Sequence, residues 1–522
     1  MTNAWEDSLE ELGKRRAWSL EHGGKKAVQR QHDEGRLTIR ERIIFLVDEG
    51  SFREIGQLSG RSSYEDGEVQ GVTPAPYVGG LARIDGRPVV VGGEDFTVRG
   101  GSSAGLARRK GGQGGFIEDV AHEYDIPLIN LSHGAGGSVN PLLRLGYAPM
   151  PGKDGLERSI SLLGRVPVVG AILGPSAGGP AARAILTHWS VMTEDTSSIM
   201  IAGPKIVERA LGEKVDRSVF GAAKMAVDKA GTVFDRVPDE EAAFDAIRQY
   251  LSYMPQNVWE LPPLGARDEN VDDLKPELRD IVPENRTKPY LMKKIVAGVM
   301  DEGSVFEFRS TYGKAVLCYL ARLDGAPVGV VAHNPMINGG GLDGAAATKY
   351  TNFIDMCDTF HLPIVFFVDS PGFMVGSRAE KSGALRLGVQ CMMAVSQLTV
   401  PTVSVIVRKC YGLGGGMSLT QNGLDLKIAW PSAEWGSLPR EGGVTVAFRG
   451  EIDNAPDPKA REKELEAELH ALSSPFRTAE AFGIEDIIDP AETRGYLARY
   501  IHLARDATSR RLGPKRRTGV RP

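Results

Sequence analysis

Segments from the first half of this 522-residue chain recur in its second half, in the same order. The clearest pair is LARIDGRPV at residues 81–89 and LARLDGAPV at residues 320–328, which lie 239 positions apart. Self-similarity at a nearly constant period indicates a duplicated structural unit, and loops of different length account for a drift in the offset. The other pairs are residues 48–51 with 301–304, 126–129 with 362–365, and 166–167 with 400–401, at offsets of 253, 236 and 234.

The duplication predicts two tandem domains that share one α/β fold. We place them at residues 1–260 and 261–522. Residues 255–289 are rich in proline and acidic side chains, which predicts a linker between the two copies. Each half has roughly 250 residues, which is enough for a hydrophobic core of its own.

Each half contains an apolar strand that runs into a glycine-rich turn. VPVVGAILGPSAGG occupies residues 166–179, and VPTVSVIVRKCYGLGGG occupies residues 400–416. The runs of valine and isoleucine predict buried strands. Several glycines directly after a strand indicate that backbone N–H groups approach another group closely. This pair of turns is therefore the candidate working site.

The composition excludes several classes of function. The chain has 42% hydrophobic and 25% charged residues, as an ordinary globular protein does, and its net charge of −5 gives no indication of nucleic-acid binding. No apolar run approaches the ~18 residues of a membrane span, and the N-terminus has no signal-peptide pattern. The four cysteines form no CxxC pair, so we expect no bound metal. We expect a cytoplasmic protein.

Two further glycine segments are candidates for ligand contact. Arg99, Gly100 and Gly101 follow a predicted strand and could bind a phosphate or another anion, with a solvated arginine on a tight turn as an equal alternative. Gly136 and Gly137 lie in HGAGGSV, residues 133–139, which matches only part of a dinucleotide-binding fingerprint.

The first turn also satisfies the GxSxG pattern of serine hydrolases, with Ser176 as the nucleophile. Cys410 stands at the equivalent position of the second turn, so the architecture persists there without the hydroxyl. His188 is too close in sequence to be a comfortable triad partner. The hydrolase is therefore the less favoured alternative.

Longer motifs are spread over nearly the whole chain: GGKKAVQRQHDEGRLTIRERI, DFTVRGGS, GPSAGG, KPYLMKKIVAGVMDEGSVFEF, VAHNPM, FIDMCDTFHLPIVFFVDSPGF, VRKCYGLGGG, WPSAE and DIIDPAETR. Together they resemble the carboxyltransferase (β) subunits of biotin-dependent acyl-CoA carboxylases, in the propionyl-CoA and methylcrotonyl-CoA carboxylase group. The resemblance implies two crotonase-like β/α-spiral domains, a homohexamer, acyl-CoA as substrate, and a biotin carboxylase/biotin carrier partner. The chain has no biotin-attachment or ATP-binding motif, so we expect only the transferase half-reaction here.

The resemblance also assigns roles to the two turns. Moving a carboxyl group from N-carboxybiotin to the α or γ carbon of an acyl-CoA creates two oxyanions, and each needs N–H donors aimed at it. By position, Gly178 and Gly179 would hold the acyl enolate, and Leu413 and Gly414 would hold biotin. Further substrate contacts are expected from Arg99, Gly100, Gly101, Gly136, Gly137, Gly415 and Gly416.

The sequence departs from the family pattern at several places, including residues 515–518, where KRRT replaces a usual final KHGN. The arginine of the family's SGGAR is missing from SHGAGG, residues 132–137. Pro180, which has no N–H, stands where relatives have alanine. YGLGGG replaces the YGGAYD of propionyl-type relatives, which predicts a larger acyl pocket around Gly416. A decarboxylase subunit that runs the same half-reaction in reverse and a non-catalytic scaffold subunit are the alternatives.

Overall fold

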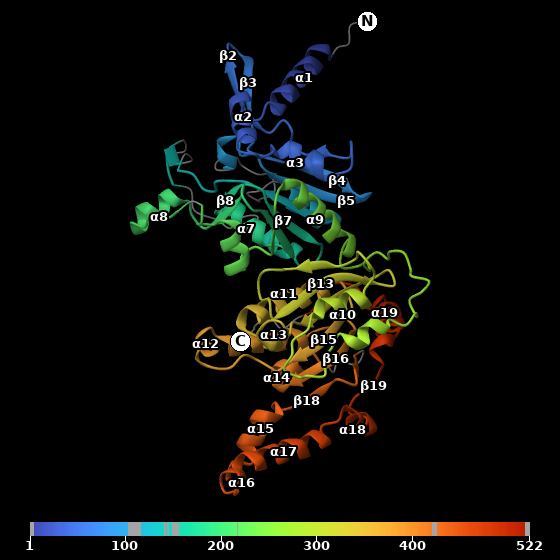
Figure 1. Ribbon diagram of the computed structural model, residues 1–522. Coiled ribbons are helices and arrows are strands. Elements are labelled where there is room, and N and C mark those ends of the chain that lie inside the picture. Colours follow the sequence, from blue (N-terminus) through green and yellow to red (C-terminus); the bar gives the residue numbers. More distant parts are fainter. Residues whose placement is uncertain are drawn as a thin grey trace. The chain divides into compact units, whose positions relative to one another are not determined.

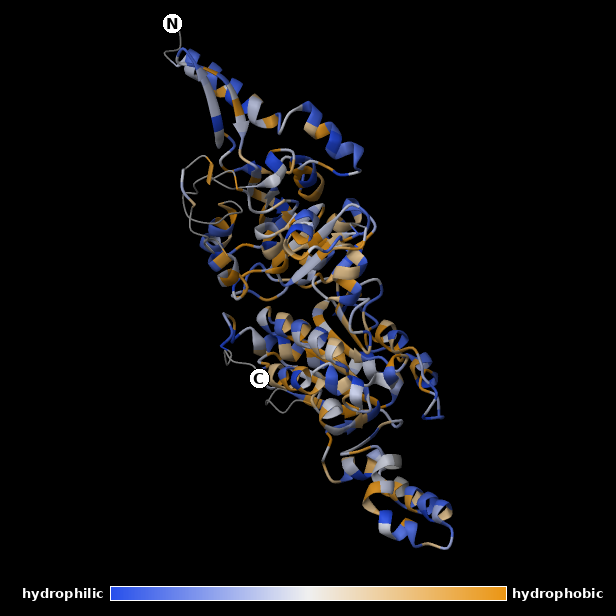
Figure 2. Cartoon of the chain, turned by 90° about the vertical axis from the view of Figure 1, so that its left-hand side faces the viewer, coloured by the Kyte–Doolittle hydropathy of each residue, from blue (hydrophilic) through white to orange (hydrophobic). Residues whose placement is uncertain are grey.

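The computed structural model describes residues 5–102, 116–139, 142–143, 146–148, 156–216, 218–419 and 425–516. The chain divides into two compact units, Met1–Val258 and Trp259–Pro522 (Figure 1). We call them unit 1 and unit 2 and describe each by itself. Figure 2 shows hydrophobic residues gathered in the interior of each unit.

A seven-stranded sheet forms the centre of unit 1. In spatial order its strands are β1 (Arg53–Glu54), β4 (Tyr77–Ile84), β5 (Arg87–Glu94), β6 (Leu128–Ser132), β7 (Val168–Ile172), β9 (Trp189–Thr193) and β11 (Asp235–Val237). β1, β4 and β5 pair antiparallel, and from β5 to β11 all neighbours are parallel. Every residue of β6, β7 and β9 is buried, as expected for parallel strands covered on both faces.

Two strand pairs lie outside this sheet. β2 (Gly60–Glu65) and β3 (Glu68–Pro74) form an antiparallel hairpin, and β8 (Pro175–Ala177) pairs in parallel with β10 (Ser198–Met200). The helices of unit 1 are α1 (Glu6–Leu20), α2 (Lys25–Asp33), α3 (Ile39–Leu46), η1 (Arg99–Gly101), α4 (Ile117–Tyr124), α6 (Leu156–Leu162), α7 (Gly179–Ile185), α8 (Pro204–Leu211), η2 (Lys224–Lys229) and α9 (Glu240–Tyr253).

The sheet of unit 2 repeats this plan. Its path is β12 (Phe306–Phe308), β13 (Val316–Leu323), β14 (Ala326–His333), β15 (Ile364–Ser370), β16 (Thr402–Tyr411), β17 (Leu426–Ala429) and β19 (Asp486–Ile487), with β18 (Glu434–Gly436) paired to the end of β16. β12, β13 and β14 pair antiparallel, and the later neighbours are parallel. The pairing of β18 with β16 corresponds to that of β10 with β8 in unit 1.

The helices of unit 2 include an additional group between β18 and β19. They are η3 (Pro276–Asp280), α10 (Met292–Val299), η4 (Asn338–Gly340), α11 (Gly344–Thr359), α12 (Ser377–Lys381), α13 (Ala384–Ser396), α14 (Gly412–Gly416), α15 (Arg440–Ala447), α16 (Arg449–Asp453), α17 (Pro458–Leu472), α18 (Pro475–Glu480), η5 (Pro490–Glu492) and α19 (Thr493–Thr508). The helices α10 and α19 bury apolar residues against the strands in one core.

The backbone confirms the predicted duplication of one α/β fold. β4 and β13, like β5 and β14, have equal lengths and are offset by 239 residues. Even unusual non-glycine conformations recur: Asp85 and Asp324 have φ angles of 48° and 49°, and Arg99 and Asn338 have 54° and 51°. Residues other than glycine rarely adopt a positive φ, so these matches indicate that the two units share one backbone path.

The prediction that residues 255–289 form a linker is wrong for much of this segment. Leu278 is fully buried in the core of unit 2, where Val271 and Ile281 pack beside it. The nearby acidic residues form ion pairs, such as Asp268 with Arg494 on α19. Proline and acidic residues in this stretch therefore mark an irregular segment that is folded onto unit 2. In the described part of the chain, no helix is both long and apolar enough to cross a membrane.

Candidate functional site

The first glycine turn connects β7 to α7. Gly178 has φ 62° and ψ −126°, a conformation open only to glycine, and α7 begins at the next residue. The first N–H groups of an α-helix have no partner inside the helix and point outward from its positive end. The N–H of Gly179 belongs to this first turn, whereas Pro180 contributes none.

The loop that follows β6 packs directly against this turn. The N–H of Ala177 donates to the carbonyl of Gly134 over 2.9 Å. Gly136 has φ 80°, and a Cβ on it would lie 2.5 Å from the carbonyl oxygen of Ala177. The structure thus brings the predicted residues Gly136 and Gly137 beside Gly178, and the close backbone approach requires glycine at position 136.

The Arg99–Gly101 turn, η1, touches the same loop. The N–H of Ala135 donates to the carbonyl of Gly100 over 2.8 Å. A Cβ on Gly101 would lie 2.8 Å from the carbonyl oxygen of His133. The side chain of Arg99 is exposed. Gly100 and Gly101 therefore support the loop, and their contact with a ligand stays a prediction.

The second turn has the same construction in unit 2. Gly412, with φ 58°, occupies the place of Gly178, and Gly372, with φ 111°, occupies the place of Gly136. A Cβ on Gly372 would lie 3.2 Å from the carbonyl oxygen of Tyr411, the equivalent of Ala177. A Cβ on Gly414 would lie 2.7 Å from the nitrogen of Phe373. Each unit thus presses a loop and a helix N-terminus together, backbone to backbone.

The remaining predicted residues of the second turn differ in their surroundings. The side chain of Leu413 is 67% exposed. A Cβ on Gly415 would lie 3.0 Å from the backbone of Cys410, whereas one on Gly416 would meet nothing within 4 Å. Gly416 therefore borders open space within unit 2.

The two turns are not equivalent donors. Superposition by the 234-residue offset places the N–H of Leu413 with that of Gly179, and Gly414 with Pro180. The second helix therefore offers two leading N–H groups where the first offers one. The predicted donors were Gly178 and Gly179 in the first turn and Leu413 and Gly414 in the second. The 234-residue offset aligns Gly178 with Gly412, so the second predicted pair begins one residue later than the first.

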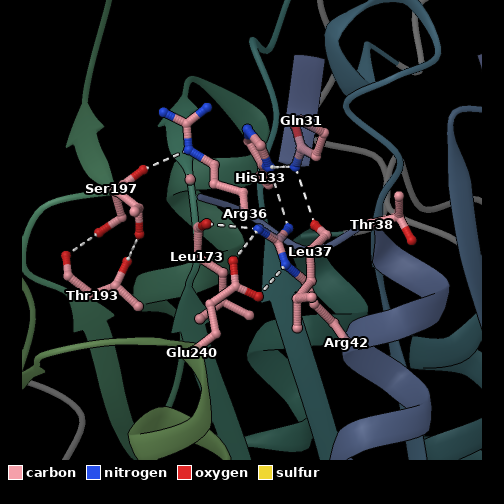
Figure 3. Close-up of polar contacts among 12 residues, drawn as sticks. Gln31, Arg36, Leu37, Thr38, Arg42, His133, Leu173, Thr193, Ser197 and Glu240 are labelled. Atoms are coloured by element: carbon pink, nitrogen blue, oxygen red, sulfur yellow. Dashed lines mark hydrogen bonds and ion pairs between the residues drawn. The ribbon is translucent and has the colours of Figure 1, made fainter. Parts of the chain in front are cut away.

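A buried arginine that sequence analysis missed holds the strand ends beneath the first turn (Figure 3). The guanidinium of Arg42 on α3 donates to both carboxylate oxygens of Glu240, over 2.8 and 2.6 Å, and to the carbonyl of Leu173 over 2.7 Å. It also lies 3.2 Å from Nδ1 of His133. Arg42 therefore links the end of β7 to the loop after β6, the two segments that form the turn.

His133 completes this cluster as a neutral side chain. Its Nδ1 accepts from both Arg42 and Gln31, which assigns the ring proton to Nε2. Burial and the nearby arginines hold the pKa of His133 well below its usual value. The ring stacks on Phe96 with centroids 4.1 Å apart, and only a glycine at position 174 leaves it room.

A buried carboxylate plays the corresponding part in unit 2. Asp369 at the end of β15 accepts from Nε of Arg408 and from the N–H of Lys409, each over 3.1 Å. The Nζ of Lys409 donates to the carbonyl of Gly339 in η4 over 3.1 Å. These contacts tie together the three segments around the second turn.

Ser176 is not part of a catalytic triad among the described residues, which argues against the serine-hydrolase alternative. The Ser176 hydroxyl is buried, lies 3.0 Å from the Ser132 hydroxyl, and donates to the Gly174 carbonyl over 3.3 Å. Among the described residues, no histidine or carboxylate is bonded to it. Burial also raises the pKa of the Cys410 thiol to about 12, so the equivalent residue is no thiolate nucleophile.

A cavity of about 490 Å³ adjoins the first turn on unit 1. Its lining includes Ser176 and Ala177 of the turn and Gly134 and Ala135 of the packed loop. Arg36, apolar residues such as Phe96, Ile206 and Phe220, and polar residues of the 195–198 segment also line it. This volume falls in the range of small-molecule sites. In the described part of the chain, no group of three or more His, Cys, Asp or Glu could hold a metal.

Comparisons with known proteins place this geometry in a family. The model of the carboxyl transferase domain matches residues 30–519. The chain is 35% identical over 521 residues to the carboxyltransferase subunit of propionyl-CoA carboxylase from Haloferax mediterranei, covering 99% of each. It is 31% identical to the α subunit of methylmalonyl-CoA decarboxylase from Propionigenium modestum, covering 93% of each.

A solved structure agrees along the whole chain. The transcarboxylase 12S subunit, determined as a hexamer with methylmalonyl-coenzyme A and methylmalonic acid bound, matches with a TM-score of 0.87 and 32% identity. The match covers 100% of this chain and 99% of that one. The fold is thus crotonase-like. The chain belongs to the carboxyl transferase family, as a carboxyltransferase of biotin-dependent acyl-CoA carboxylases.

Proposed function

We propose that the first turn holds the enolate oxygen of an acyl-CoA and that the second holds the ureido oxygen of biotin. The observation that carries this proposal is the double construction itself: in each unit a loop and a helix N-terminus meet around glycine backbone. Two such turns suit a reaction in which negative charge develops on two separate groups.

We propose the N–H of Gly179 as a donor of the first turn and the N–H groups of Leu413 and Gly414 as donors of the second. Because Pro180 lacks an N–H, a second donor of the first turn must come from elsewhere. Gly178 was the sequence-based choice, and the loop at Gly136 and Gly137 lies against the same turn. Gly415 and Gly416 then border the second site.

The cavity of unit 1 supports the assignment of this unit to acyl-CoA. It has the volume and the largely apolar wall that a thioester and its acyl group require, and it opens beside Ala177. We accordingly propose residues 1–260 as the acyl-CoA side and residues 261–522 as the carboxybiotin side. When bound on a partner subunit, carboxybiotin supplies the carboxyl group.

The likeness to the 12S hexamer supports a hexamer of this chain, and light scattering of the purified protein tests it. A cytoplasmic biotin carboxylase/biotin carrier subunit is the expected partner. Blotting for biotin after co-purification from the native organism would identify it.

The decisive experiment is a half-reaction without the partner. Purified chain is mixed with methylmalonyl-CoA and free biotin, and we expect loss of the carboxyl group that depends on biotin. Gly179→Pro removes one donor at a helix position that tolerates proline, and we expect a decrease of about 10²–10³-fold in rate. No turnover with any acyl-CoA would favour the scaffold subunit, and turnover that does not depend on biotin would contradict the proposed half-reaction.

A decarboxylase in the cell is the second candidate, because the Propionigenium modestum relative carries that name. Both candidates share the half-reaction, so the partner distinguishes them: a biotin carboxylase indicates carboxylation, and its absence from the complex indicates decarboxylation.

The preference for acyl groups larger than propionyl that YGLGGG predicts requires the acyl group to reach the open space at Gly416 in unit 2. Each methylene that fits contributes roughly 0.8 kcal/mol. A panel of acyl-CoAs, assayed with wild type and Gly416→Asp, tests this: preference of the wild type for acetyl- or propionyl-CoA contradicts it.

A further inference from the structure

Arg36 contributes the one cationic side chain to the described wall of the cavity beside the first turn. It lies between α2 and α3, and its side chain is 14% exposed. The same wall contains Ala177 of the turn. A cation in a largely apolar cavity is costly unless it is paired, so its surroundings show what it is prepared to bind.

The guanidinium is held in place from one edge. Its Nε donates to the carbonyl of Thr196 over 2.8 Å, and its Nη1 pairs with the half-exposed carboxylate of Glu34. The segment that provides Thr196 is itself fixed, because the Thr193 and Thr196 hydroxyls lie 2.7 Å apart and Ser197 donates to the Thr193 carbonyl. Arg36 is therefore oriented before any ligand arrives.

Part of the guanidinium stays available. An arginine has five N–H groups, and these two contacts use one on Nε and one on Nη1. Asp195 also lines the cavity, but no ion pair joins it to Arg36 among the described residues. The positive charge of Arg36 reaches the neighbouring His133, whose pKa it helps to depress. The cavity thus presents an oriented arginine whose Nη1 pairs with Glu34, while its Nη2 makes no hydrogen bond among the described residues.

We propose that Arg36 binds an anionic oxygen group of the acyl-CoA in this cavity. The proposal rests on the assignment of unit 1 to acyl-CoA. Two groups have the required chemistry: a phosphate of coenzyme A, or the carboxylate that the product carries and the substrate lacks. Both accept from the planar fork of a guanidinium.

The test measures binding of three probes by calorimetry to wild type and Arg36→Met. Propionyl-pantetheine has neither anion, propionyl-CoA has only the phosphates, and methylmalonyl-CoA has both. We expect Arg36→Met to weaken binding of the anionic probes by about 10- to 100-fold and to leave propionyl-pantetheine unchanged. Loss for methylmalonyl-CoA alone assigns the carboxylate, and equal loss for both CoA esters assigns a phosphate.

Two variants serve as controls. Arg36→Lys keeps the charge without the fork and should lose less affinity than Arg36→Met. Arg30→Met removes an exposed arginine of α2 outside the cavity wall and should bind all probes as wild type does. Unchanged binding of both CoA esters by Arg36→Met, or weaker binding of propionyl-pantetheine as well, would overturn the proposal. If the wild type binds none of the probes, the assignment of unit 1 to acyl-CoA fails instead.

Discussion

The two glycines of the loop after β6, Gly136 and Gly137, differ in how strictly the backbone requires glycine. Gly136 has a positive φ and sits against the carbonyl of Ala177, whereas a Cβ on Gly137 would meet nothing within 4 Å. Their neighbouring positions make them a matched pair for measuring what the close contact contributes.

We expect Gly136→Ala to destabilise unit 1 by about 1–3 kcal/mol and to lower biotin-dependent decarboxylation at least tenfold, because the loop must move away from the turn. Gly137→Ala should change both quantities little. Denaturant unfolding and the half-reaction measure them. Equal effects of the two substitutions would contradict the close-packed backbone described for this loop.

Ser176 provides a second prediction at this scale. Its hydroxyl is buried and shared with Ser132 and Gly174, so it is a structural group in this fold. We expect Ser176→Ala to keep the half-reaction within a few-fold of wild type, and we expect no labelling of Ser176 by a fluorophosphonate. Labelling, or loss of activity by orders of magnitude, would revive the hydrolase.

At the scale of elements, Arg42 on α3 pairs with Glu240 on α9 and also donates to the carbonyl of Leu173, just before the first turn. The Arg42–Glu240 pair is buried, and removing one partner of such a pair leaves an unpaired charge at a cost of about 3–5 kcal/mol. We therefore expect Arg42→Met to destabilise unit 1 strongly and to lower the half-reaction with it.

The double variant Arg42→Met/Glu240→Gln separates charge from packing. It should recover part of the stability in a double-mutant cycle of denaturant unfolding, because neither residue then leaves a buried charge. Additive losses would show that the two side chains act independently of each other.

Local patterns predicted the elements but not this contact. The β-branched runs before each turn predicted the buried strands β7 and β16, and the repeat predicted two units with the same fold. Arg42 and Glu240 lie 198 residues apart, and no local pattern signals that α3 buries an arginine. Ile44 on the same helix is 67% exposed, because the buried face of the helix includes Arg42 instead. The sequence alone does not show that Arg42 is buried, because its partner Glu240 is distant in sequence.

At the scale of the whole molecule, both units bury histidines that stay neutral. Burial lowers the pKa of His333 to about 4 and holds that of His133 below its usual value, 6.5. In the unfolded chain these histidines bind protons more readily, so stability is complete above pH 6.5 and falls as the pH drops below it. The depressed pKa of Asp95 acts only below its usual value of 3.8.

We expect His333 alone to remove about 2 kcal/mol of unfolding free energy between pH 6.5 and 5. Denaturant midpoints of unit 2 at several pH values measure this, with His333→Gln as the comparison, since glutamine does not titrate. The variant should show a shallower loss of stability towards low pH. Identical slopes for both proteins would assign the acid sensitivity to other groups.

The difference between Pro180 and its counterpart Gly414 bears on how the two copies evolved. As long as a gene encoded a single copy of this fold, positions 180 and 414 were one and the same position. That position could then hold proline or glycine, but not both. The difference between Pro180 and Gly414 could arise only after the copy had been duplicated. Duplication thus allowed each turn to change independently while keeping the same backbone.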